Sequence, residues 1–242
     1  STMQQKRKLD GVPYGRQCLF KNEIFLRLLD MECAACVSLN RKRTGGSHLR
    51  RTCPRWFIRK EGAIAMNKYL IAYFSRKGEN YVNGQILDLP VGNTEVAAKE
   101  IQNLTGGDLF CIQPAREYAE NYRKCVAEAR EELQSGARPE ILDCVRNWDA
   151  YDTIFLGYPN WCGTMPMPVW TFLGSYDFAG KTILPFCTNE GSGMGHSEAD
   201  IRGLCPTAAL KKGLSVRGSS VGTARAEIAA WLKSEGIPVA GD

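Results

Sequence analysis

After residue 66, short apolar runs alternate with segments in which apolar residues recur every three or four positions. The runs predict strands buried on both faces, and the longer spacing predicts helices with one buried face. Five strand–helix units in series predict an α/β fold with a doubly wound, five-stranded parallel sheet and right-handed crossovers. The predicted strands are 68–75, 108–112, 152–157, 181–187 and 214–217, and the predicted helices are 95–105, 118–134, 166–173, 197–204 and 223–233.

A turn signal interrupts the connection between the first strand and the first helix. Asn83-Gly84 stands between two short runs, Tyr81-Val82 and Gln85-Ile86. Both residues of this dipeptide tolerate the positive φ that a two-residue hairpin turn requires. The pattern therefore predicts a hairpin inserted after the first strand. Two interpretations stay open: a lid over a ligand, or a surface loop without a function.

One residue departs from the strand pattern. Pro185 falls inside the fourth predicted strand, and proline has no backbone N–H to donate to a neighbouring strand. The order of the units makes this strand central. We therefore expect Pro185 to lie near the end of the strand, where one missing hydrogen bond is tolerated.

The junction between the first strand and the first helix has the features of an anion site. Ser75 ends the strand, and Asn93 and Thr94 stand where the helix begins. The first N–H groups of a helix lack partners within it, and the helix end carries a partial positive charge. Neither the Gly-x-x-x-x-Gly-Lys-Ser/Thr motif of triphosphate sites nor the Gly-x-Gly-x-x-Gly motif of dinucleotide sites occurs. The predicted ligand of this anion site is therefore a monophosphate.

Polar loops follow three of the predicted strands, at 75–94, 159–165 and 188–195. The carboxyl ends of parallel strands share one edge of the sheet, and ligands bind there. The second and third loops are rich in Gly, Asn, Thr and Ser, and Trp161 adds one aromatic face. This composition suits a planar heterocycle, whose stacking on the indole would contribute about 0.5–1.5 kcal/mol beyond burial.

The formal net charge of +5 is unevenly distributed. Residues 1–65 hold 14 Lys and Arg against 5 Asp and Glu, and residues 66–242 hold 17 against 21. This asymmetry predicts two different parts, a basic extension and a folded domain. We expect the extension to be disordered or to be translated upstream sequence, with the natural start at Met66. The reason is that codons for Lys60-Glu61-Gly62 can contain a bacterial ribosome-binding sequence, a few codons upstream of Met66.

Two alternatives for the extension are a zinc site and a nucleic-acid site. Cys33 and Cys36 have the spacing of one ligand pair, but Cys18, Cys53 and His48 do not supply a second pair with metal-ligand spacing. The arginine clusters are typical of nucleic-acid binding. We favour neither, and expect no metal and no nucleic-acid partner.

Cysteine usage and hydropathy bear on the location of the protein. Six of the ten cysteines lie after residue 66 without metal-ligand spacing, which predicts free thiols in a reducing cytoplasm. No run of residues is long and apolar enough to span a bilayer. We therefore expect a cytoplasmic protein without a membrane partner.

Residues 66–236 resemble the flavodoxin family, in particular a bacterial subgroup whose phosphate loop is split by an extra segment. The resemblance implies a flavodoxin-like fold with strand order 2-1-3-4-5 and noncovalent FMN as the cofactor. The residues that carry it are Ala72-Tyr-Phe-Ser75, Val91-Gly-Asn-Thr-Glu95, Phe155-Leu-Gly-Tyr-Pro-Asn-Trp161, Gly163-Thr-Met-Pro166, Pro185-Phe-Cys-Thr188 and Gly191-Ser-Gly193.

The resemblance also assigns site residues by position. Cys162 stands where close relatives carry a second Trp, and the third loop has no Tyr to sandwich the ring, so Met194 or Tyr81 is a candidate substitute. No catalytic residue is implied. The assigned residues are Ser75, Arg76, Asn93 and Thr94 for the phosphate, Pro159, Asn160, Trp161, Gly163 and Thr164 for one side of the isoalloxazine, and Thr188, Glu190, Gly191 and Gly193 for its other side.

The function implied by the resemblance is electron transfer through FMN to a partner redox protein. Two alternatives stay open, because fold and cofactor do not decide between them. One is an NAD(P)H-dependent FMN reductase of quinones or nitro compounds, and the other is a binding module that no longer holds FMN.

Overall fold

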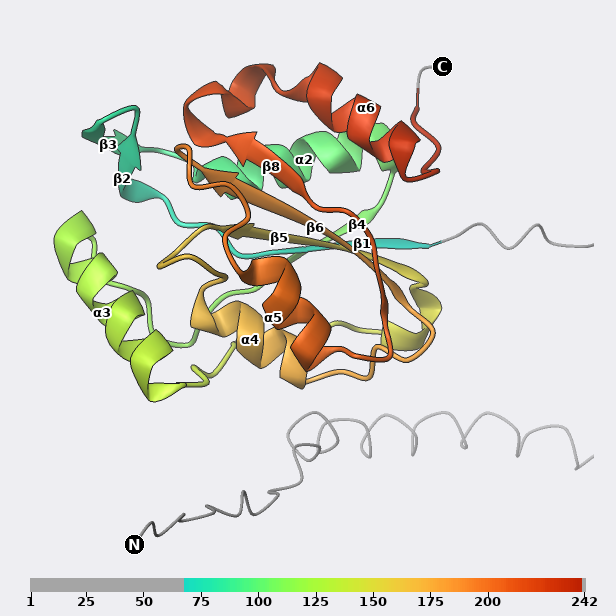
Figure 1. Cartoon of the computed structure of the whole chain (residues 1–242), viewed down its shortest axis with the longest axis horizontal. Coiled ribbons are helices and arrows are strands. Elements are labelled where there is room, and N and C mark those ends of the chain that lie inside the picture. The colour runs from blue at the N-terminus through green and yellow to red at the C-terminus, as the bar shows by residue number, and fades with distance from the viewer. Residues whose placement is uncertain (1–67, 241–242) are drawn as a thin grey trace, which may run out of the picture. The chain divides into compact units, whose positions relative to one another are not determined.

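The computed structural model of the chain describes residues 68–240, so the predictions for the basic extension lie outside the described residues. Its centre is a parallel sheet in which β4 and β5 flank β1, and β6 follows β5 (Figure 1). Two short strands, β7 and β8, pair with the outer side of β6. The predicted strand order is confirmed, with the fifth strand in two pieces. The bounds are β1 (Tyr69–Tyr73), β4 (Asp108–Cys111), β5 (Thr153–Pro159), β6 (Thr182–Asn189), β7 (Ala209–Leu210) and β8 (Leu214–Arg217).

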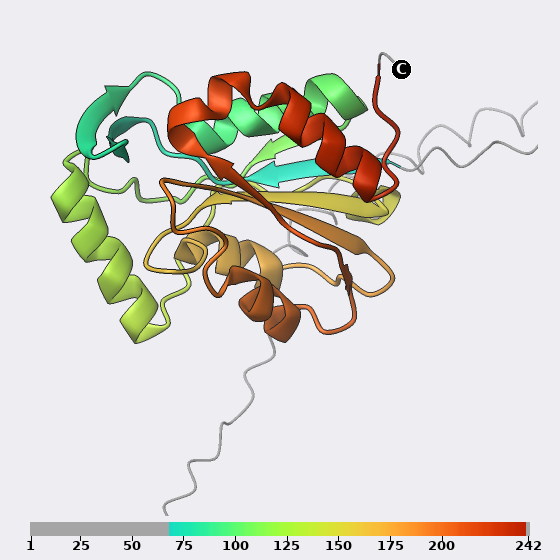
Figure 2. The ribbon, with the colours of Figure 1, turned by 45° about the horizontal axis from the view of Figure 1, so that its top comes forward.

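Helices cover both faces of the sheet, as a doubly wound fold requires. α2 (Asn93–Thr105) and α6 (Arg225–Ser234) lie on one face, and α4 (Met167–Gly174) and α5 (Ser197–Leu204) lie on the other (Figure 2). Each face has its own buried apolar cluster, one around Ile101, Phe186 and Ile228 and one around Tyr158, Phe172 and Ile201. Two short 3-10 helices, η3 (Trp148–Ala150) and η4 (Gly218–Thr223), complete the connections.

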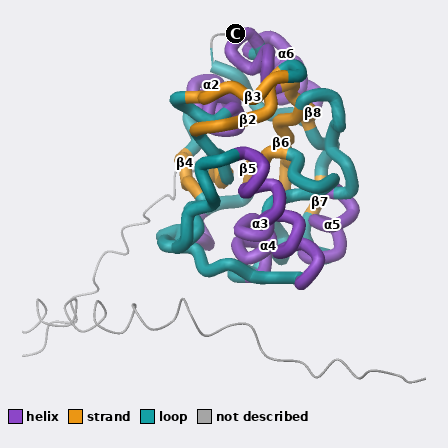
Figure 3. Tube along the Cα trace, turned by 90° about the vertical axis from the view of Figure 1, so that its left-hand side faces the viewer, coloured by secondary structure: helices purple, strands orange, loops and turns teal. Residues whose placement is uncertain are grey.

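The predicted hairpin is present as β2 (Gly78–Val82) and β3 (Gln85–Leu89), which form a separate two-stranded sheet. Asn83 and Gly84 make its turn, with φ of 46° and 88°. The hairpin lies beyond the carboxyl edge of the main sheet, next to α3 (Tyr122–Ser135) (Figures 1 and 3). The insertion therefore lies at the same edge of the sheet as the three polar loops.

Helix α3 begins four residues later than the sequence predicted. Asn121 has extended backbone angles, and its side chain accepts a hydrogen bond from the amide of Lys124 at 3.2 Å, which makes it the cap. Tyr118 consequently lies outside the helix, where its ring contacts those of Phe74 and Trp161. The predicted start at Tyr118 was wrong because the apolar spacing that included Tyr118 reflects tertiary packing rather than a helix turn.

Pro185 lies in the middle of β6 and not near its end, so that expectation was wrong. Hydrogen bonds alternate along this strand: the carbonyl of Ile183 accepts from Lys211 on the β7 side, and the carbonyl of Thr188 accepts from Asn160 on the β5 side. Odd-numbered residues of β6 thus face the outer edge. The missing N–H of Pro185 points at residues 211–213, where the edge strand is interrupted, and no pairing is lost there.

Among residues 68–240, no helix combines the length and the apolar composition that crossing a bilayer requires.

Candidate functional site

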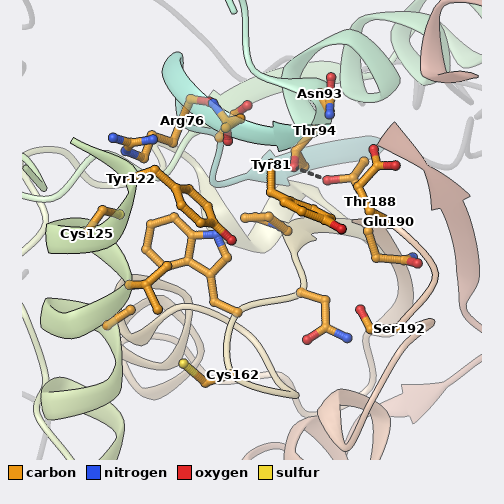
Figure 4. Close-up of a pocket in the computed structure, with 18 of the residues that line it drawn as sticks. Arg76, Tyr81, Asn93, Thr94, Tyr122, Cys125, Cys162, Thr188, Glu190 and Ser192 are labelled. Carbon is orange, nitrogen blue, oxygen red and sulfur yellow. Dashed lines mark hydrogen bonds between the residues drawn. The ribbon is translucent and has the colours of Figure 1, made fainter. Parts of the chain in front are cut away.

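A cavity of about 390 Å³ opens at the carboxyl edge of the sheet (Figure 4). This volume is within the range of about 300–1,000 Å³ that small-molecule sites span. Walls come from the three predicted loops, from the hairpin and from α3. The lining residues are Ser75, Arg76, Asn80, Tyr81, Asn93, Thr94, Tyr122, Cys125, Val126, Ala129, Arg130, Pro159, Asn160, Trp161, Cys162, Thr188, Asn189, Glu190 and Ser192.

One end of the cavity is the N-terminus of α2. Gly92 caps the helix without a side-chain bond, and the hydroxyl of Ser75 accepts a hydrogen bond from the amide of Glu95 at 3.0 Å. The amides of Asn93 and Thr94, at the start of the helix, have no acceptor within it. A Cβ on Gly92 would lie 2.2 Å from the Ser75 hydroxyl and 2.5 Å from the carbonyl oxygen of Arg76. Gly92 therefore packs closely against Ser75 and Arg76 at the start of α2, where free amides and the helix dipole favour binding of an anion.

Arg76 lines this cavity, but its guanidinium is engaged elsewhere. It donates hydrogen bonds to the carbonyls of Glu79, Ala119 and Glu120, the Ala119 bond measuring 2.7 Å. These contacts fasten the end of β1 to the hairpin and to the segment before α3. Arg76 is therefore built into the wall of the site, in addition to being a candidate for the phosphate.

This arrangement predicts that Arg76→Ala destabilises the apoprotein by about 1–3 kcal/mol, because three carbonyls lose a charged donor. Urea unfolding of the cofactor-free protein measures the effect. The neighbouring exposed cation provides the control, and Lys77→Ala is expected to change the unfolding free energy by less than about 0.5 kcal/mol. A loss of FMN affinity with unchanged stability would show that Arg76 serves the phosphate alone.

Two buried threonines connect the phosphate end of the site to the sheet. The hydroxyls of Thr94 and Thr188 are 2.7 Å apart and hydrogen-bonded (Figure 4). Thr94 is in the first turn of α2 and Thr188 is near the end of β6, so the bond fixes the helix terminus against the third loop.

Trp161 is held in a tight turn. Its amide and carbonyl pair with those of Thr164, and the two residues between them, Cys162 and Gly163, have φ of 53° and 88°. The indole makes edge contacts with the rings of Phe74 and Tyr118, at centroid distances of 5.3 and 5.0 Å. These contacts fix the orientation of the one tryptophan among the lining residues.

Four predicted residues do not line the cavity. The hydroxyl of Thr164 donates to Asp200 of α5, away from the site. The amides of Gly191 and Gly193 donate to the side-chain oxygen of Asn189, and the amide of Gly163 donates to that of Asn160. These amides are used to shape the loops, so their part in holding a ring stays a prediction.

Asn160 connects the second and third loops. Its side-chain amide donates to the carbonyl of Gly193 at 2.8 Å, while its backbone amide donates to Thr188 at 2.9 Å. A Cβ on Gly195 would lie 2.0 Å from the carbonyl oxygen of Gly163, so the two loops touch where side chains are absent. The loops that were predicted to converge therefore do so.

Glu190 is the buried acid of the site. Its side chain is 9% exposed, and its oxygen Oε2 lies 3.7 Å from Nε of Arg217. Oε2 also accepts a hydrogen bond at 3.2 Å from the amide of Asn83, in the turn of the hairpin. Oε1 is buried and accepts no hydrogen bond from the residues that the structure describes. Glu190 thus carries one buried acceptor without a donor.

The wall formed by α3 was not predicted. Tyr122, Cys125, Val126 and Ala129 face the cavity, and the ring of Tyr122 stacks on that of Tyr81 at 6.4 Å between centroids. Of the two candidate substitutes for a third-loop Tyr, Tyr81 lines the cavity and Met194 does not. The sequence signal for this wall was the spacing of Cys125 and Ala129, which are one helix turn apart. This spacing predicts that one face of the helix is buried, but not which part of the protein that face contacts.

Burial sets the chemistry of the thiol in this wall. It raises the pKa of Cys125 to about 11, so the thiol stays protonated at neutral pH. Burial also raises the pKa of the Tyr122 hydroxyl. Both side chains therefore present neutral surfaces, which suit a flat aromatic guest better than a charged one.

The sequence matches the family described as flavodoxin over residues 68–235. The chain belongs to the flavodoxin family. This membership confirms the predicted family and supports FMN as the cofactor. A search of curated proteins gave no match.

Three solved structures of flavoproteins are similar to this chain. A candidate flavoprotein from Bacteroides eggerthii is 29% identical, with a TM-score of 0.58, and the match covers 70% of this chain and 98% of that one. A second, from Bacteroides uniformis, is 29% identical with a TM-score of 0.55, covering 69% and 98%. A flavoprotein from Lactobacillus acidophilus in complex with FMN is 19% identical with a TM-score of 0.47, covering 64% and 95%.

The residues of the cavity fit FMN. The amides of Asn93 and Thr94 would hold the phosphate, the unpartnered oxygen of Glu190 would accept from a hydroxyl or N–H, and Trp161 and Tyr81 would border the ring. Bound FMN supplies the capacity to accept and release one or two electrons, and the protein adjusts its electronic surroundings.

Proposed function

We propose that this protein holds FMN noncovalently and exchanges electrons between it and a partner redox protein. The observation that supports this is the position of exposed apolar side chains. Tyr81, Ile86 and Leu87 of the hairpin and Val91 directly after it are exposed, and Leu142 is the one other large apolar side chain exposed among the described residues. All four lie within residues 81–91, and Tyr81 also lines the cavity. Exposed apolar side chains gathered in one segment are typical of a contact with another protein.

The hairpin itself adds to this proposal. Tyr81 and Ile86 are paired across its two strands, so their side chains share one face, and Tyr81 also lines the cavity. A partner that covers this face would stand within reach of the cofactor. Of the two interpretations of the insertion, a part in the site is therefore supported over a surface loop without a function.

A second candidate function is reduction of quinones or nitro compounds with NAD(P)H. The wall formed by α3 supports it, because Tyr122, Cys125, Val126 and Ala129, together with Arg130, extend the cavity beyond the loops. That additional space suits a flat organic substrate.

Anaerobic reduction of the FMN-loaded protein distinguishes the two candidates. We expect reconstituted protein to show flavin absorbance, and we expect NADH and NADPH to leave it oxidised over minutes while dithionite bleaches it at once. Complete bleaching by either nucleotide at a catalytic rate would favour the reductase. Protein that stays colourless after addition of FMN would contradict both candidates and support a module without the cofactor.

We also propose that the protein is bacterial and cytoplasmic. Six cysteines among the described residues are free thiols, as is usual in a reducing compartment, and the two structures at 29% identity are bacterial.

A further inference from the structure

The carboxylate of Glu190 contacts two parts of the site at once. Oε2 accepts the hydrogen bond from the amide of Asn83, in the turn of the hairpin. Oε1 is buried without a donor from residues 68–240, and the Glu190 side chain is 9% exposed and lines the cavity. A buried carboxylate oxygen without a hydrogen bond is costly. The arrangement therefore favours a ligand that brings a donor to Oε1.

The surroundings of Oε1 indicate which part of a ligand would reach it. A Cβ on Gly218 would lie 2.7 Å from Oε1 and 2.3 Å from the side-chain nitrogen of Asn93, so Oε1 and the Asn93 side chain are packed closely against Gly218, near the start of α2. Figure 4 shows Glu190 on the side of Asn93 and Thr94, across the cavity from Tyr122 and Cys125. Oε1 therefore lies at the end of the cavity where α2 begins.

FMN carries hydrogen-bond donors at that place. Its ribityl chain joins the phosphate to the ring and has three hydroxyl groups, whereas an ionised carboxylate only accepts hydrogen bonds. A ribityl hydroxyl is therefore the donor that a cofactor anchored at α2 would present to Oε1.

The tip of the hairpin depends on the same carboxylate. At its base, the hairpin is held by Glu79, whose carboxylate accepts from the amide of Tyr122 at 2.7 Å and from the side chain of Asn121 at 3.0 Å. At its tip, the described hydrogen bond to the rest of the protein is that from Asn83 to Glu190. The hairpin has no strand pairing with the main sheet, and isolated two-stranded hairpins are marginally stable.

We propose that Glu190 couples FMN binding to closure of the hairpin, with Oε1 accepting a hydrogen bond from a ribityl hydroxyl while Oε2 holds the amide of Asn83. The proposal rests on the proposed binding of FMN. Binding orders the carboxylate, and the ordered carboxylate fixes the hairpin tip. The surface that meets the redox partner is then presented in one position when the cofactor is in place.

Hydrogen exchange of the hairpin amides, measured with and without saturating FMN, tests the coupling. In the unaltered protein we expect FMN to slow exchange across residues 82–85 by about tenfold. Glu190→Gln keeps the shape of the side chain but has a single acceptor oxygen, so it cannot serve both groups. We expect it to bind FMN about tenfold more weakly by fluorescence titration and to show no FMN-dependent protection of the hairpin when saturated.

Arg217→Gln is the matched control, because it removes the cation beside Glu190 and leaves both carboxylate oxygens in place. We expect it to keep the protection and to change FMN affinity less than threefold. Circular dichroism and a thermal melt check that both variants fold. FMN binding without any change in hairpin exchange would overturn the coupling and leave the proposed function standing. Glu190→Gln with unaltered affinity and protection would also overturn it, and a lack of FMN binding by the unaltered protein would overturn both proposals.

Discussion

Replacing Gly92 by alanine is expected to weaken FMN binding by roughly 100-fold. The new Cβ would lie 2.5 Å from the carbonyl oxygen and 2.8 Å from the carbonyl carbon of Arg76, which are backbone atoms, so the phosphate loop has to move. Two displaced charge-assisted hydrogen bonds of about 1.5 kcal/mol each account for a change of this size. Fluorescence titration of the apoprotein with FMN measures it.

The backbone of Gly92 makes this substitution informative. Its φ of −70° and ψ of 146° are open to alanine, so the expected loss comes from the close approach and not from backbone strain. Gly174→Ala is the control, because a Cβ there meets no atom within 4 Å, and we expect its FMN affinity to be unaltered. Unaltered affinity in Gly92→Ala as well would mean that the phosphate does not bind at the start of α2.

Replacing Gly157 by alanine is expected to destabilise the protein by about 3 kcal/mol or more. Gly157 lies in β5, and a Cβ there would lie 2.2 Å from the ring of Phe186, which is fully buried in the apolar cluster beneath α2 and α6. A ring enclosed on all sides cannot move aside without disturbing its neighbours. Urea unfolding of the apoprotein measures the change.

A second substitution tests whether the ring is the cause. Phe186→Leu makes room next to Gly157 and leaves a small cavity, so it destabilises the protein by itself. If the clash is real, the two substitutions together will cost clearly less than their separate costs combined. Additive costs would show that Gly157 is needed for another reason, and Gly203→Ala, where a Cβ meets no atom within 4 Å, is expected to be neutral.

The fold could be predicted because each of its units has a local cause. Buried strands appear as apolar runs, and the hairpin follows from Asn83-Gly84, whose positive φ values are confirmed. The meeting of the three loops follows from the geometry of parallel strands, whichever residues the loops contain. These features depend on neighbours in the sequence or on a rule that holds for the whole fold class.

The direction of individual polar groups could not be predicted, because it depends on partners far away in the chain. The guanidinium of Arg76 donates to carbonyls more than 40 positions later, and Asn160 uses its amide to reach Gly193. The close approaches at Gly92 and Gly157 have the same origin. In the sequence these two glycines look like Gly174, and only the packed structure distinguishes them.

The interrupted outer strand has a consequence for behaviour at high concentration. A continuous edge strand is a template on which another chain can add a strand, and natural proteins avoid this with short edges and lysines. Here the edge consists of pieces of two and four residues, separated at Lys211, Lys212 and Gly213. Opposite this break, Pro185 needs no partner. This rim is thereby protected from intermolecular sheet extension, and the molecule is safeguarded there against fibrous aggregation.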